Sequence, residues 1–123
     1  MSDEETLLSE TQGDRLIITL NRPDKRNSID LPMLARFHEI LDEAEEDDVL
    51  RMIIIQGVDG IFCTGMDLGG FVSDTELSSD ESPYMNLLKR FSSIDKVVIA
   101  RVDGTVMAGG IGLAAASDLV FAH

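Results

Sequence analysis

The chain has one cysteine, few positive charges and no long apolar run, and each of these features excludes a class of structure or partner. Cys63 is its only cysteine, so no disulfide can form within the chain. No apolar run approaches the length of a membrane span, and the N-terminus lacks the basic-then-apolar layout of a signal peptide. We therefore expect a cytoplasmic protein without a membrane partner.

Positive charge is scarce, because ten Lys and Arg residues stand against 23 Asp and Glu residues, a formal net charge of −13. Nucleic acid is therefore a poor partner. Acids make up seven of the ten residues in 39–48 and four of the ten in 73–82, which we interpret as a solvated helix face and a solvated loop. The overall acidity is typical of a halophilic protein adapted to high intracellular salt.

Strand-like and helix-like segments alternate along the 123 residues, 44% of which are hydrophobic. The segment 15–20 and the residues before the turn at Gly13 predict a hairpin. Further strands are expected at 51–57, 96–102 and 118–122, and helices at 31–47, 84–94 and 109–117. The segment 61–71 is expected to pass from a short strand through Gly65 into a short helix. This alternation predicts a single α/β domain with buried, mostly parallel strand pairing.

The expected helix at 31–47 has both a start signal and an apolar stripe. Asp30 can cap it, and Pro32 falls in its first turn. His38 lies off the stripe, so we expect it to be solvated and to have no catalytic role. The stripe recurs at three- and four-residue spacing and consists of Leu34, Phe37, Leu41 and Ala44.

A cluster of glycines in MAGGIGLAAASDL (107–119) requires an explanation, because glycine in a helix is about 1 kcal/mol less favourable than alanine. Residues 110–115 match G-x-G-x-x-A, but no strand closely precedes them and no ribose-binding acid follows. Close packing against a sheet accounts for Gly112 and the alanines. A second glycine-containing turn, CTGMD (63–67), also opens a helix. Two helix N-termini can direct free N–H groups at one anionic oxygen.

Three segments together resemble the crotonase (enoyl-CoA hydratase/isomerase) family. They are LNRPDKRNSID (20–30), IFCTGMDL (61–68) and VDGTVMAGGIGLAAASDLVFA (102–122). The resemblance covers residues 7–123 and implies a crotonase-like spiral of repeated ββα units. It matches about the first half of the family's domain, so we expect 1–123 to be one incomplete, truncated domain with the N-terminal core.

The resemblance also implies a binding site for an acyl-CoA thioester. In the family, two backbone N–H groups form an oxyanion hole around the thioester carbonyl, and the matching positions here are Met66 and Gly109. Lys25 and Arg26 match the stretch that lines the adenine and phosphate region of coenzyme A.

Neighbouring positions complete the implied site. Gly65 and Gly110 flank the two amides, and Asp67 is more plausible as a helix cap than as a catalytic acid. Weaker candidates for shaping the groove are Asn27, Thr64 and Leu68. The coenzyme A thioester would be the substrate, with no metal and no separate cofactor, and a complete fold is expected to form a homo-oligomer.

One departure from the family leaves two functions open. Hydratases of this family use two glutamates; the first matches Gly112, and the second would lie beyond His123. The chain is then either an acyl-CoA enzyme, performing hydration, isomerisation or thioester hydrolysis with other acid and base groups, or a non-catalytic remnant or assembly partner.

Overall fold

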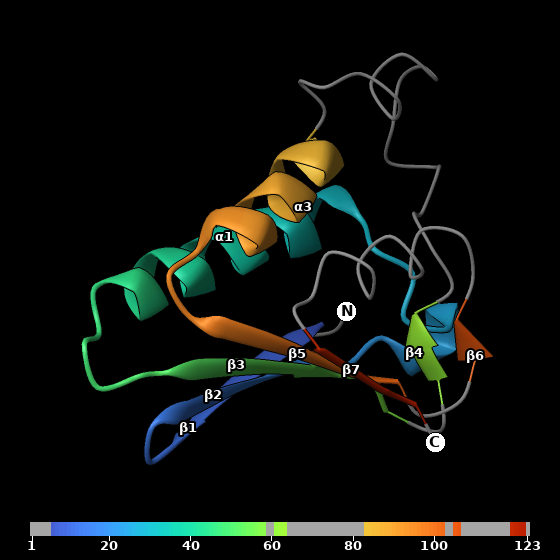
Figure 1. Cartoon of the computed structure of the whole chain (residues 1–123). Coiled ribbons are helices and arrows are strands. Elements are labelled where there is room, and N and C mark those ends of the chain that lie inside the picture. Colours follow the sequence, from blue (N-terminus) through green and yellow to red (C-terminus); the bar gives the residue numbers. More distant parts are fainter. Residues whose placement is uncertain (1–5, 59–60, 64–82, 103–104, 107–118, 123) are drawn as a thin grey trace.

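The computed structural model describes residues 6–58, 61–63, 83–102, 105–106 and 119–122. Five strands form one sheet in the order β1-β2-β3-β5-β7 (Figure 1). β1 pairs antiparallel with β2, and every other neighbouring pair in this sheet is parallel. The strands are β1 (Leu7–Gln12), β2 (Arg15–Leu20), β3 (Met52–Gln56), β5 (Val97–Val102) and β7 (Leu119–Ala122).

A second, parallel sheet contains β4 (Ile61–Cys63) and β6 (Thr105–Val106). The helices are η1 (Pro23–Lys25), a single 3-10 turn, α1 (Leu31–Glu45) and α3 (Pro83–Ser93). Figure 1 shows α1 and α3 side by side on one face of the five-stranded sheet. Two strands followed by a helix occur as β1-β2-α1 and again as β3-β4-α3, so the expected α/β fold of ββα units is confirmed.

The hairpin between β1 and β2 depends on one glycine. Gln12 pairs with Arg15, and the two-residue loop between them starts at Gly13, whose φ is 64°. Glycine adopts this left-handed conformation without steric cost. No heavy atom beyond its chain neighbours lies within 4 Å of the position a Cβ would take, so the loop needs glycine for its backbone conformation and not for space.

Helix α1 begins where the sequence predicts. The carboxylate of Asp30 accepts a hydrogen bond of 3.0 Å from the Met33 N–H, which satisfies one of the free donors of the first turn. The whole predicted stripe is buried, together with Met33 and Ile40. The helix thus places a continuous apolar face on the sheet.

Alternate residues of the central strands supply the other side of the core, including Ile18, Ile53 and Val98. Helix α3 adds Leu87 and Phe91, and the Phe91 ring meets the Phe37 ring edge to face at 5.9 Å between centroids. The core therefore lies between the sheet and the pair of helices.

Strand β6 was not expected from the sequence, and neither was the burial of Leu87. The helix expected at 109–117 and the one expected after Gly65 lie outside the described residues.

Candidate functional site

The carboxyl ends of the parallel strands define the candidate site. Because β2, β3 and β5 run in one direction as neighbours, they end at one edge of the sheet. Each is followed there by a different element: η1 after β2, β4 after β3 and β6 after β5. Ligands of open α/β sheets bind outside this edge. It also carries the segments that the resemblance assigns to acyl-CoA.

The small sheet aligns two of those segments. Ile61 pairs with Thr105 and Cys63 with Val106, with an irregularity in register between them. Met66 follows Cys63 by three residues, and Gly109 follows Val106 by three. The two predicted amide positions therefore leave neighbouring parallel strands at the same offset.

Most of the predicted contact residues lie outside the described residues. They are Thr64, Gly65, Met66, Asp67, Leu68, Gly109 and Gly110, together with Gly112. Lys25, Arg26 and Asn27 are described, and they lie together in the turn between β2 and α1.

This turn exposes two cations. Lys25 ends η1 and Arg26 follows it, and both are exposed. Arg26 has φ 54° and Asn27 has φ 58°, so two consecutive non-glycine residues are left-handed. Such residues are uncommon and are found where the surrounding structure holds them.

Asn27, a weaker candidate for shaping the groove, lies inside the protein beneath this turn. Its side chain is fully buried and is the only buried polar side chain among the described residues. Its Oδ1 accepts a hydrogen bond of 2.7 Å from the Arg22 N–H. Arg22 has no role predicted from the sequence, yet its guanidinium donates to the Ser28 carbonyl at 3.0 Å and lies 3.4 Å from the Asp30 carboxylate.

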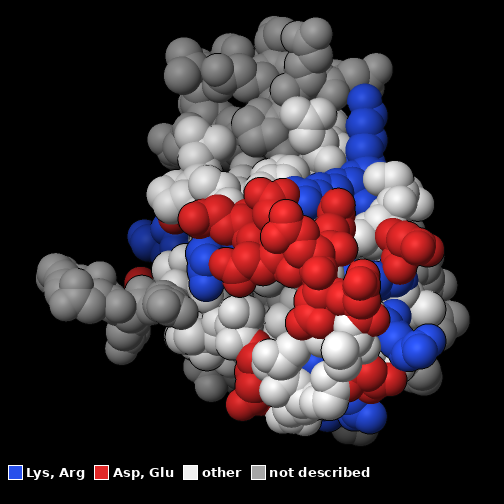
Figure 2. All heavy atoms as spheres, turned by 90° about the vertical axis from the view of Figure 1, so that its left-hand side faces the viewer, with Lys and Arg blue, Asp and Glu red and all other residues white. Residues whose placement is uncertain are grey.

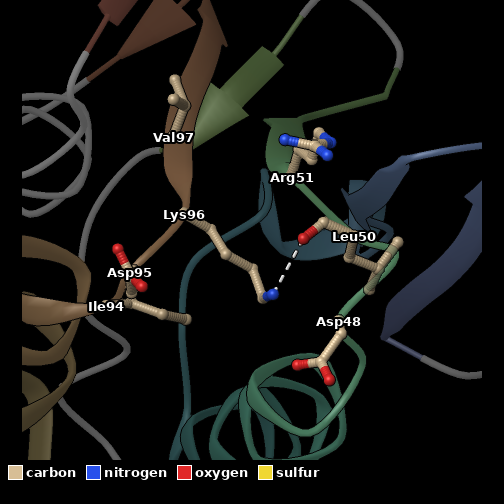
Figure 3. Close-up of a pocket in the computed structure, with 7 residues that line it drawn as sticks. All are labelled: Asp48, Leu50, Arg51, Ile94, Asp95, Lys96 and Val97. Atoms are coloured by element: carbon tan, nitrogen blue, oxygen red, sulfur yellow. Dashed lines mark hydrogen bonds between the residues drawn. The ribbon is translucent and has the colours of Figure 1, made fainter.

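A cavity of about 830 Å³ lies at the opposite edge of the sheet, before β3 and β5 (Figure 3). Lys96 points into it, and its Nζ donates hydrogen bonds to the Leu50 carbonyl at 2.8 Å and the Asp47 carbonyl at 3.0 Å. Two acids, Asp48 and Asp95, also line it. The Lys96 ammonium group therefore connects the loop before β5 to the loop before β3. We interpret the cavity as a contact between two loops and not as an anion-binding site.

A charged cluster joins α1 to α3. Arg90 donates to Asp42 at 2.6 Å and to Glu45 at 2.9 and 3.0 Å. Burial lowers the pKa of Arg90, but the hydrogen bonds and charges of Asp42 and Glu45 outweigh it, so the pKa is raised overall. The other acids at the C-terminal end of α1 form an exposed patch (Figure 2). The predicted solvated face is confirmed there.

His38 is half-buried, so its predicted solvation is wrong. Its Nδ1 lies 3.0 Å from Nη1 of Arg90, which also donates to the His38 carbonyl at 3.2 Å. Since the guanidinium can only donate, Nδ1 is the acceptor in this contact. His38 therefore has a structural role between the two helices.

None of the helices in the described part of the chain is both long and apolar enough to cross a membrane. The same residues contain no group of three His, Cys, Asp or Glu side chains arranged to hold a metal ion.

The fold is that of an α/β protein built from ββα units, with the candidate site at the carboxyl ends of its parallel strands. Residues 10–123 match the model of the enoyl-CoA hydratase/isomerase family. The chain therefore belongs to the enoyl-CoA hydratase/isomerase, or crotonase, family.

Relatives of known sequence support this assignment. The 1,2-epoxyphenylacetyl-CoA isomerase of Escherichia coli is 33% identical over 125 residues, covering 96% of this chain and 47% of the relative. Enoyl-CoA hydratase EchA19 of Mycobacterium tuberculosis is 31% identical, covering 91% of this chain and 44% of the relative. The chain thus spans about half the length of the curated relatives it matches.

Solved structures agree. Pseudomonas aeruginosa AtuE superposes with a TM-score of 0.86 at 32% identity, covering 96% of this chain and 48% of that one. An enoyl-CoA hydratase from Thermoplasma volcanium superposes with a TM-score of 0.84 at 33% identity, covering 95% and 48%.

Proposed function

We propose that this chain binds an acyl-CoA thioester at the carboxyl edge of its sheet, with the thioester oxygen held by the backbone N–H groups of Met66 and Gly109. Family membership gives the ligand class, since the names of the matched relatives specify CoA compounds or enoyl-CoA hydratases. The observation that carries the proposal is the pairing of Cys63 with Val106.

The pairing supports a two-donor site through chain geometry. Neighbouring strands lie about 4.8 Å apart, and three residues reach at most about 11 Å. Met66 and Gly109 each follow one member of the pair by three residues. These lengths allow both amides to approach a single oxygen, as an oxyanion hole requires.

The exposed cations of the β2–α1 turn support binding of the nucleotide end of the ligand. Lys25 and Arg26 follow the carboxyl end of β2, which neighbours β3. Coenzyme A carries negatively charged phosphates, which a chain of net charge −13 repels. Two basic residues at the carboxyl ends of the strands would offset this repulsion locally.

A comparison of two ligands tests the carbonyl contact. Butyryl-CoA has the thioester oxygen, whereas S-butyl-CoA, the matching thioether, lacks it. Two N–H donors each contribute about 1 kcal/mol net to a bound carbonyl, so butyryl-CoA should bind more than tenfold tighter in titration calorimetry. Equal affinities would contradict the two-donor site, and binding of neither ligand would contradict the ligand class.

A second candidate function, acyl-CoA binding without hydratase activity, is favoured by Gly112, which occupies the position of the first hydratase glutamate. Adding water to an enoyl thioester needs a group that deprotonates water and one that protonates the α-carbon, each worth roughly 10²–10⁴ in rate. Gly112 can do neither, and we interpret Asp67 and Asp118 as a helix cap and a strand-entry residue.

We therefore expect the purified chain to show no loss of the enoyl absorbance band of a short trans-2-enoyl-CoA. The variant Gly112→Glu alone should not restore activity, because one carboxylate supplies only one of the two groups that hydration requires. A steady absorbance loss in the wild type that disappears in Gly109→Pro would show that the acid and base lie elsewhere in this chain.

A further inference from the structure

The turn between β2 and α1 holds an unusual backbone. Arg26 has φ 54° and ψ 37°, and the next residue, Asn27, has φ 58°. L-residues other than asparagine, aspartate and glycine seldom adopt this region. The pair therefore needs specific contacts to persist.

Asn27 supplies those contacts from inside the protein. Its side chain is fully buried; its Oδ1 accepts from the Arg22 N–H at 2.7 Å, and its own N–H donates to the Arg22 carbonyl at 2.8 Å. The asparagine thus bonds both backbone groups of Arg22 and closes the loop that carries Lys25 and Arg26. A substituted side chain without the acceptor would remove this hydrogen bond from the Arg22 N–H.

The closed turn is also fixed to the start of α1. The Arg22 guanidinium donates to the carbonyl and the hydroxyl of Ser28 at 3.0 and 3.2 Å and pairs with Asp30 at 3.4 Å. The other oxygen of Asp30 caps α1. Lys25 and Arg26 are therefore the exposed tip of a turn that is anchored at both ends.

We propose that Asn27 is a positioning residue for ligand binding: its buried amide fixes the left-handed turn and so holds the Lys25 and Arg26 cations toward the phosphates of coenzyme A. This inference rests on the function proposed above. Because Asn27 is fully buried, it acts through the backbone of the turn and does not touch the ligand.

Two variants separate the amide from the backbone conformation. Asn27→Gly permits the left-handed conformation but removes the acceptor, and Asn27→Ser shortens the side chain. Each is titrated with butyryl-CoA and with S-butyryl-N-acetylcysteamine, a thioester that carries no nucleotide and no phosphate.

We expect Asn27→Gly or Asn27→Ser to bind butyryl-CoA about tenfold more weakly than the wild type. Binding of the phosphate-free thioester should not change, whereas a purely structural defect would weaken both ligands. In a Lys25→Ala/Arg26→Ala background the effect of Asn27→Gly should disappear, since the cations it positions are gone.

The inference is overturned if every Asn27 variant that keeps the wild-type circular dichroism spectrum binds butyryl-CoA as the wild type does. It is also overturned if the two ligands weaken equally. Failure of the proposed function has a different signature, because the wild type itself would then bind neither butyryl-CoA nor the phosphate-free thioester.

Discussion

Individual side chains hold the turns between strands and helices and the contacts between the two helices. The role of Asp30 as a helix cap could be predicted from the sequence. An acid followed two positions later by a proline, just before a stripe of apolar residues, is a common helix start. The contacts of Arg22, Asn27 and Arg90 could not be predicted from the sequence. Arg90 bonds residues 45 to 52 positions away, and the burial of Asn27 depends on packing that local pattern does not contain.

At Asp30, two functions can be separated by substitution. Asp30→Ala should lower the free energy of unfolding by about 1 kcal/mol through the lost cap, and further through the lost pairing with Arg22. Asp30→Asn keeps the capping oxygen and should recover the first part only. Urea denaturation measures both variants, and equal destabilisation would show that the cap contributes nothing.

Arg90 allows a test of pH dependence. Its folded-state pKa is raised above its ordinary value, so its contribution to stability is fully present below that value and is lost only as pH rises through the folded pKa. Asp42 and Glu45 are largely exposed, so the loss in Arg90→Met should be modest, about 1 kcal/mol. We expect the same loss at pH 7.5 and at pH 10, measured by urea denaturation. A loss that shrinks toward pH 10 would contradict this account.

At the scale of elements, the pattern of apolar residues was sufficient for the hairpin, for α1 and for the central strands. It was not sufficient for β6, whose two residues are a strand only because they pair with β4. In α3 the adjacent Leu87 and Leu88 are equally apolar, and only the packing shows that Leu87 is fully buried and Leu88 partly so. Sequence pattern thus predicts elements that carry their own periodicity and misses those defined by a distant partner.

The two helices are joined by aromatic packing. Phe91 is 1% exposed and meets Phe37 edge to face, so Phe91→Ala should lower the free energy of unfolding by about 3–5 kcal/mol. Leu88→Ala, at a partly buried position of the same helix, is the matched control and should have a smaller effect. Equal losses from the two variants in chemical denaturation would contradict this account, because the full burial of Phe91 and its contact with Phe37 would then add nothing to stability.

For the molecule as a whole, charge is the dominant property. A net charge of −13 repels itself in the compact state, and the exposed acids at the end of α1 concentrate part of it on one face (Figure 2). Salt shortens the range of this repulsion to about 3 Å at 1 M.

The melting temperature should therefore rise between 0.1 and 2 M KCl. The variant Glu43→Gln/Glu46→Gln, which neutralises two exposed acids of the patch, should show a smaller rise. A melting temperature that is flat or falls with KCl would contradict the role of self-repulsion.

The central claim is that two backbone amides, of Met66 and Gly109, hold the thioester oxygen. Calorimetric titration of butyryl-CoA against matched pairs tests it most directly: Met66→Leu with Met66→Pro, and Gly109→Ala with Gly109→Pro. Proline alone removes the N–H. We predict that both proline variants lose affinity tenfold or more relative to their matched partners, while each keeps its circular dichroism spectrum. Folded proline variants that bind as tightly as the leucine and alanine variants would contradict the claim.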